Sequence, residues 1–266
     1  MATFNEYILK DATQGYLGKV LGDARGEFVS NVVALVSASP MLQKCEPSTV
    51  MFAAIKATAL RLPIDASLGL AYVVPYGGVA QFQIGWRGLV QLALRTNLYR
   101  TINVRDVRRG EIVGEDFASG ELRFSPLPAE RRASAEVVGY LSFFELCNGF
   151  RKMGFWTVED IRAHAQRFSK TYANGGGVWA SNFDAMAKKT ALKLLLSRFG
   201  PLSVEMQGAI SADQAVLSAE GPEYADNRAA VSIEAEAEAQ GDTIAAKVMA
   251  ASAAAIGKTN KTNNND

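Results

Sequence analysis

Residues 181–199 combine an apolar helical face with a cluster of lysines, a pattern that could hold a polyanion. Apolar side chains recur there at the i, i+3, i+4, i+7 spacing of one helix face. Lys189 and Lys193 flank that face four residues apart, and Lys188 lies near its other edge. An ordinary solvated helix face would carry similar charges. The assignment of a polyanion site therefore depends on the rest of the chain.

Among the other basic residues, Arg87 is the strongest candidate for a phosphate contact. It stands between Trp86 and Gly88, where a strand is expected to turn into a helix, so backbone amides and a guanidinium could both reach a phosphate. Single-strand nucleic-acid binders mix such cations with aromatic faces, because base stacking contributes about 1 to 3 kcal/mol per base without needing a particular sequence. Core packing is the alternative role for Phe82, Trp86 and Trp179.

The charges are segregated along the chain, although the formal net charge is only +1. Up to Ala212 there are 24 Lys and Arg against 18 Asp and Glu, whereas from Asp213 onward there are 4 against 9. Residues 81–200 carry 18 basic and 11 acidic side chains. The positive charge is therefore concentrated in the middle of the chain, as a nucleic-acid binder requires.

The sequence contains only weak matches to the motifs of catalytic sites. Residues 15–20 lack the spacing and the hydroxyl of a phosphate-binding loop. The acidic pairs at 115–116 and 159–160 stand where a turn or a helix start would hold acids anyway, and His164 is the only histidine. We expect a protein that is not an enzyme, with no cofactor and no metal site. Magnesium could modulate its activity without a dedicated protein site.

Composition is that of a globular protein: 266 residues, 48% hydrophobic and 21% charged. No apolar run is long enough for a membrane helix and no secretory signal is apparent, which predicts a cytoplasmic protein without membrane contact. Cys45 and Cys147 lie far apart without metal-like spacing, so we expect two reduced thiols.

The periodicity predicts an α+β fold, with antiparallel hairpins flanked by helices in one core domain. Ser48 is expected to cap a helix that Pro63 stops, and Asn148-Gly149 is expected to form a type I′ turn. Thr157 and Asp160 resemble a capping box. The other expected helices cover residues 27–36 and 89–95, and the expected strands cover 70–75, 79–84, 101–108, 137–147 and 150–156.

Two expectations concern exposed or mobile parts of this fold. Gln81 and Gln83 alternate with Phe82 and Ile84, which predicts one polar face on the first hairpin. Residues 169–178, with glycines at their centre, are expected to form a long mobile loop.

Three segments differ in composition. We expect residues 1–44 to form an N-terminal helical segment that could contact another subunit, and residues 45–212 to form the DNA-annealing core. Residues 213–266 are acidic and rich in Ala and Asn, which predicts a disordered tail able to dock a partner.

Three blocks of the core resemble the RecT family of phage and prophage single-strand annealing proteins. They are residues 68–77 (LGLAYVVPYG), residues 81–93 (QFQIGWRGLVQLA), and Trp179 followed by residues 186–190 (MAKKT). Trp86 and Arg87 replace the tyrosine or lysine that is common at the family's glycine-rich turn. The resemblance runs from about residue 45 to residue 210, and it leaves the first forty residues and the tail uncovered.

The resemblance implies ATP-independent annealing of complementary single strands, and strand exchange or invasion, beside a 5′-to-3′ exonuclease. Its partners would be single-stranded DNA, the annealed duplex intermediate, and further copies of the chain in a ring or helical filament. The tail could dock the exonuclease or a host single-strand DNA-binding protein. Alternative functions are a single-strand protector without annealing activity and a metal-dependent nuclease.

The residues and the resemblance together define a predicted DNA site. It comprises Gln83, Trp86, Arg87, Arg95, Arg105, Arg109, Lys170, Trp179, Lys188, Lys189, Lys193 and Arg198.

Overall fold

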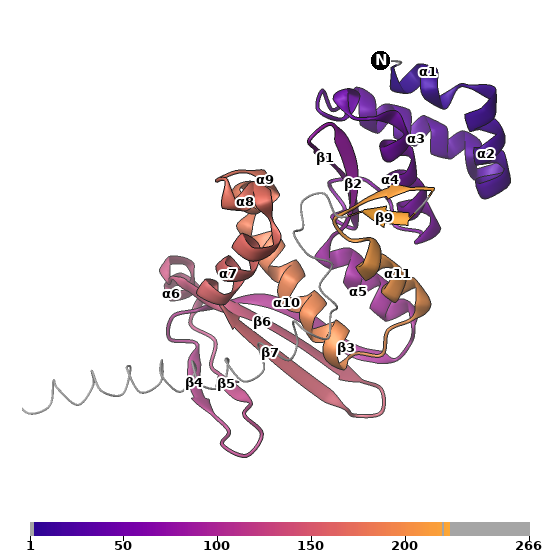
Figure 1. Ribbon diagram of the computed structural model, residues 1–266. Coiled ribbons are helices and arrows are strands. Elements are labelled where there is room, and N and C mark those ends of the chain that lie inside the picture. The colour runs from indigo at the N-terminus through magenta and orange to yellow at the C-terminus, as the bar shows by residue number, and fades with distance from the viewer. Residues whose placement is uncertain (1–2, 220, 224–266) are drawn as a thin grey trace, which may run out of the picture.

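A run of helices precedes the first strand in the computed structural model, which describes residues 3–219 and 221–223 (Figure 1). Thr3 and Glu6 form a capping box at its start. The sequence predicted α3 and α4 individually but not α2, because this glycine-containing helix is stabilised by burying Thr13 and Leu17. The run consists of α1 (Phe4–Ile8), α2 (Asp11–Leu21), α3 (Arg25–Ser37) and α4 (Pro47–Ala59), with 3₁₀ turns at Gly22–Ala24 and Leu42–Lys44.

The start of α4 differs from the expectation. Glu46 is the N-cap residue and Pro47 occupies the first turn, so the prediction that Ser48 caps this helix is wrong. The Ser48 hydroxyl instead donates to the Glu46 carboxylate at 2.6 Å.

The first hairpin belongs to a four-stranded sheet whose strand order is β1-β2-β8-β9. It is built from β1 (Ala71–Tyr76), β2 (Val79–Ile84), β8 (Ala215–Ser218) and β9 (Gly221–Glu223), all antiparallel. Gln81 and Gln83 are buried, so the prediction of an exposed polar face is wrong. The predicted boundary at Asp213 is also too early, because Asp213 is buried and β8 pairs with β2. The rest of the predicted disordered tail, residues 224–266, lies outside the described residues.

The second sheet follows α5 (Trp86–Arg95) and has the strand order β3-β6-β7. Ile102 and Val104 point inward and Asn103 and Arg105 outward, as the alternation predicts. Only Gly149 has a positive φ at the turn between β6 and β7, so this turn is not of type I′. The strands are β3 (Tyr99–Arg108), β6 (Val137–Leu146) and β7 (Arg151–Thr157), and the β3–β6 connection contains β4 (Ile112–Glu115), β5 (Leu122–Phe124) and α6 (Ala129–Ser134).

The remaining helices are grouped around the longest one. The predicted capping box at Thr157 and Asp160 is present, and the expected mobile loop at 169–178 instead contains α8 and the start of α9. These helices are α7 (Val158–Phe168), α8 (Lys170–Ala173), α9 (Gly177–Ser181), α10 (Phe183–Phe199) and α11 (Val204–Ala212). None of the described helices is long and apolar enough to span a membrane.

The structure has the α+β fold that the sequence predicts. Helix α10 lies at its centre. It packs on the β3-β6-β7 sheet on one side and against α5 on the other (Figure 1). Leu192 and Leu196, which lie opposite the main apolar stripe, are fully buried. The Ser142 hydroxyl of β6 donates to the Ala191 carbonyl oxygen at 3.0 Å, which fixes the helix on the sheet.

Candidate nucleic-acid interface

A buried ion pair lies at the centre of α10. The Lys189 Nζ is 2.7 Å from the Asp213 Oδ1, and the two residues are only 4% and 2% exposed. The Lys193 Nζ lies 3.3 Å from the second oxygen, and the Ile84 amide donates to Oδ1 at 3.1 Å. Asp213 directly follows α11, so its carboxylate connects the end of α11 to α10 and to the end of β2.

The charge environment keeps Asp213 ionised. Burial alone would raise the pKa of this carboxyl, but the ammonium groups of Lys189 and Lys193 and the Ile84 amide lower the pKa below its usual value. The expectation that Lys189 lies on an exposed ridge is wrong, because its charge is compensated inside the core. Lys188 remains near the surface, where its Nζ lies 2.7 Å from the Asp184 carboxylate.

The three sequence blocks meet at an open pocket of about 270 Å³, which we call the hairpin pocket. One wall comes from the loop at 66–69, from β1 and from the β2–α5 junction. The opposite wall comes from residues 178–189 of α9 and α10. Figure 1 shows α8 and α9 next to the start of α10, with β1 and β2 across from them. Segments about a hundred residues apart in the chain thus form one site.

Two glycines shape the mouth of the hairpin pocket. A Cβ atom on Gly85 would collide with the Gly69 carbonyl oxygen, and one on Gly88 would collide with the Leu70 carbonyl oxygen. The Gly85 amide donates to that Leu70 carbonyl at 2.9 Å. Only glycine permits this close approach of the loop to the start of α5. The approach fixes the position of Trp86 and Arg87.

Arg87 is exposed at the rim of the hairpin pocket. Its guanidinium carbon lies 5.5 Å from the centre of the Trp86 ring, and one guanidinium nitrogen donates to the Leu68 carbonyl at 3.4 Å. No side chain caps the N-terminus of α5, whose first residue is Trp86. A guanidinium, an aromatic face and a helix N-terminus therefore lie together, which suits a phosphate and an adjacent base.

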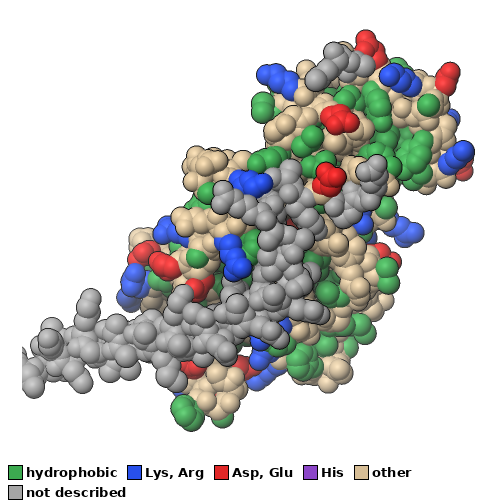
Figure 2. All heavy atoms as spheres, viewed as in Figure 1, with side chains coloured by type: hydrophobic (Ala, Val, Ile, Leu, Met, Phe, Trp, Pro, Cys, Tyr) green, Lys and Arg blue, Asp and Glu red, His purple; other side chains and the backbone are tan. Residues whose placement is uncertain are grey.

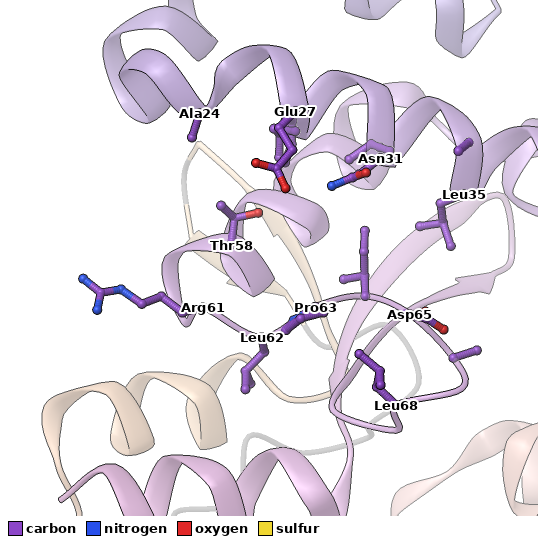
Figure 3. Close-up of a pocket in the computed structure, with 15 residues that line it drawn as sticks. Ala24, Glu27, Asn31, Leu35, Thr58, Arg61, Leu62, Pro63, Asp65 and Leu68 are labelled. Carbon is purple, nitrogen blue, oxygen red and sulfur yellow. The ribbon is translucent and has the colours of Figure 1, made fainter.

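A larger pocket of about 740 Å³ lies between α3 and residues 58–68 and has a different character. Figure 3 shows Glu27 and Asn31 of α3 pointing toward the segment that carries Thr58, while Arg61 extends away. Asp65 adds a second carboxylate to the lining. Acidic groups that face a cavity disfavour a phosphate backbone, so this pocket is the weaker candidate for DNA.

Comparison with known sequences identifies the family. A sequence profile of the RecT family matches residues 26–231. The chain belongs to the RecT family. It is 43% identical over 192 residues to the uncharacterized protein YqaK of Bacillus subtilis, covering 72% of this chain and 65% of that relative. It is 29% identical over 183 residues to protein RecT of Escherichia coli, covering 66% of each. The chain thus spans slightly less than two thirds of the length of either relative.

The structure of this RecT-family chain brings together only part of the predicted site. Gln83, Trp86, Arg87 and Lys189 line the hairpin pocket. Trp179 lies behind it, buried against Tyr172, Phe183 and His164. The predicted residues that do not line the pocket are Arg95, Arg105, Arg109, Lys170, Trp179, Lys188, Lys193 and Arg198.

Several of these cations have structural partners. Arg95 donates to the Leu60 and Arg61 carbonyls at 2.6 and 2.8 Å, which holds the end of α4 against α5. The guanidinium of Arg109 lies 2.6 Å from the Glu136 carboxylate. Arg105 is exposed on the edge strand β3. Lys170 begins α8, and Arg198 lies over the Phe199 ring at 5.2 Å.

The sequence reasoning missed three residues of the site. Tyr72 and Asn182 line the hairpin pocket, and Asp213 neutralises its lysine. Tyr72 lies within residues 68–77, a block that resembles the RecT family, and this resemblance was the signal that could have found it. No sequence signal pointed to Asp213, because its partner Lys189 is 24 residues away and the contact depends on tertiary packing. Within the described ranges, no three His, Cys, Asp or Glu side chains are grouped so that they could share a metal ion.

His164 lies behind the hairpin pocket, in a small cavity of about 50 Å³ that Lys193 and Asp213 also line. In the described part of the chain its buried Nδ1 has no hydrogen-bond partner. Burial, and the positive charges of Lys193 and Arg167, lower the pKa of His164 to about 3. The imidazole therefore stays neutral in the folded protein at physiological pH.

We predict that Asp213→Asn destabilises the protein by about 3 to 5 kcal/mol, because it leaves the Lys189 ammonium buried without a counter-charge. Lys189→Met combined with Asp213→Asn should recover most of that loss. Lys188→Ala, which removes a surface pair, should cost about 0.5 kcal/mol or less. Urea unfolding of the four proteins measures these values. Equal stability of Asp213→Asn and wild type would contradict the role of the pair.

We also predict an acid-sensitive contribution from His164. The unfolded state takes up a proton below a pH of about 6.5, whereas the folded state does so only near 3, so stability falls as the pH drops between these values. From pH 7.5 to 5.0 the loss should be about 2 kcal/mol larger in wild type than in His164→Leu. Urea unfolding at both pH values measures it, and identical pH dependence in the two proteins would refute it.

Proposed function

We propose that this RecT-family protein binds single-stranded DNA and anneals complementary strands without ATP, promoting homologous pairing and strand exchange in phage-type recombination. Family membership over residues 26–231 supports a role in recombination. The concentration of basic residues between 81 and 200 supports a polyanionic ligand.

The main support for this proposal is that the three sequence blocks meet at the hairpin pocket. The pocket mouth presents the exposed Arg87 guanidinium, the half-buried Trp86 ring and the uncapped start of α5. These groups suit a phosphate and a π face, neither of which depends on base identity. A strand held by its backbone keeps most base edges free for a complementary strand, which is the requirement for annealing.

We predict that Arg87→Ala weakens single-strand binding and slows annealing, because it removes a phosphate contact. The slope of log affinity against log salt should become shallower by about 0.7. The matched control is Arg131→Ala, which changes an exposed arginine of α6 outside the pocket and should leave both readouts unchanged. The assay is annealing of two complementary fluorescent oligonucleotides without ATP, at several salt concentrations.

The same assay distinguishes the alternative functions. Wild-type binding without faster annealing would replace the proposal with a single-strand protector. Loss of substrate that a chelator prevents would replace it with a metal-dependent nuclease. Normal annealing by Arg87→Ala would leave the function standing and remove Arg87 from the site.

We further propose that copies of the chain associate into a ring or a helical filament, so that adjacent sites follow one strand. Tyr16 and Val20 are four residues apart on α2 and exposed, and Leu9 before them is exposed as well. Figure 2 shows hydrophobic side chains gathered over the N-terminal helices. An exposed apolar face of this kind suits a second copy, since a head-to-tail contact repeats along a polymer.

Val20→Glu should therefore reduce self-association, because a charge would be buried in the contact. The matched control is Val204→Glu, at an exposed valine in the first turn of α11, where an acid is well tolerated. Light scattering with long single strands should show smaller particles for Val20→Glu alone. Particles of wild-type size would place the contact elsewhere.

The remaining expectations stay predictions. They are cytoplasmic localisation, docking of a 5′-to-3′ exonuclease or a host single-strand DNA-binding protein on residues 213–266, and modulation by magnesium without a protein site.

A further inference from the structure

The walls of the hairpin pocket are mostly apolar and aromatic. Tyr72 and Trp86 contribute rings from the β1–β2 side, and Val178 and Met186 face them from α9 and α10. At about 270 Å³ the pocket falls below the roughly 300 to 1,000 Å³ of sites for drug-sized ligands. Its size therefore suits one planar ring system better than a larger ligand.

Two carboxamide side chains line this mostly apolar pocket, of which Gln83 is buried and Asn182 is exposed. Gln83 is 8% exposed, and among the described residues its amide nitrogen makes a weak 4.0 Å contact to the Met186 sulfur. Asn182 accepts a hydrogen bond from the Ala185 amide through its oxygen, which leaves its NH₂ group available. A carboxamide can both donate and accept, and a burial as deep as that of Gln83 is costly unless a ligand supplies partners.

The register of the hairpin explains why this amide faces the pocket. Tyr72 is paired with Gln83 across β1 and β2, so both side chains lie on the same face of the sheet. Phe82 and Ile84 occupy the other face and are fully buried. The hairpin thus presents a ring and an amide side by side, which matches the flat face and polar edge of a nucleobase.

We infer that the hairpin pocket holds one unstacked base from the stretch of single strand that each subunit binds, an inference that rests on the proposed DNA binding. The base stacks against Tyr72 or Trp86 and bonds the amide of Gln83, while Arg87 at the rim holds the adjoining phosphate. A base held in this way is withdrawn from pairing, so the pocket favours single strands over duplex. The amide of Gln83 accommodates different bases because it offers a donor and an acceptor.

The test compares oligo(dT) with an abasic deoxyribose-phosphate strand of equal length. Wild type should bind oligo(dT) more tightly by a factor of about 5 to 150, the range expected from one stacked base. Ala185→Phe, which fills the pocket, should lower that ratio at least fivefold and leave abasic binding within twofold of wild type. Ala185→Ser is the control of matched size and should keep the wild-type ratio.

Gln83→Leu provides a second variant that keeps the shape of the pocket but removes the amide. Gln83→Leu should also lower the ratio of oligo(dT) affinity to abasic-strand affinity. It serves as the test if circular dichroism shows that Ala185→Phe is unfolded. Equal binding of both strands by wild type would overturn the base pocket while DNA binding stands. Equal loss on both strands in the variants would overturn it too, by showing that the pocket acts on the backbone. Absence of binding to either strand by wild type would overturn the proposed function itself.

Discussion

The buried pair of Lys189 and Asp213 is the constraint on which the rest of this structure depends. Removing two charges from water is expensive, and the cost is offset only where geometry is good and further hydrogen bonds are made. Lys193 and the Ile84 amide complete that environment. Ile84 directly precedes the turn of Gly85, Trp86 and Arg87, so the ion pair also positions the mouth of the hairpin pocket.

Several cations are paired inside the fold, which reduces the positive charge that the surface can offer to a polyanion. Lys189 and Lys193 share one carboxylate, and Arg95 is occupied by backbone carbonyls. The hairpin pocket is consequently dominated by rings and a single exposed guanidinium rather than by many lysines. The proposed DNA binding would depend more on stacking, and less on counterion release, than the number of basic residues suggests.

Rigidity at the pocket mouth has a simple steric origin. The loop before β1 crosses the start of α5 so closely that only glycine fits at positions 85 and 88. On the opposite wall, Trp179 packs against Tyr172 and Phe183, which anchors the short helices α8 and α9 onto α10. Both walls are therefore held by packing within the chain, an arrangement that lowers the entropic cost of binding a ligand.

The sequence by itself determined the elements whose stability is local. Apolar periodicity defined α10, alternation defined β3, and the capping residues Thr157 and Asp160 defined the start of α7. Motif spacing also determined the family, because short blocks need no tertiary information. These patterns report which side of an element is apolar, but not what covers the other side.

Only the tertiary structure decided which polar residues are buried and which segments meet. Strand β8 covers β2 from more than a hundred residues away, which buries Gln81 and places Asp213 beside Lys189. Helix α2 likewise depends on packing rather than on intrinsic propensity. The physical reason is that burial energy is set by contacts between distant segments, whereas sequence periodicity records only the preference of each segment for a face.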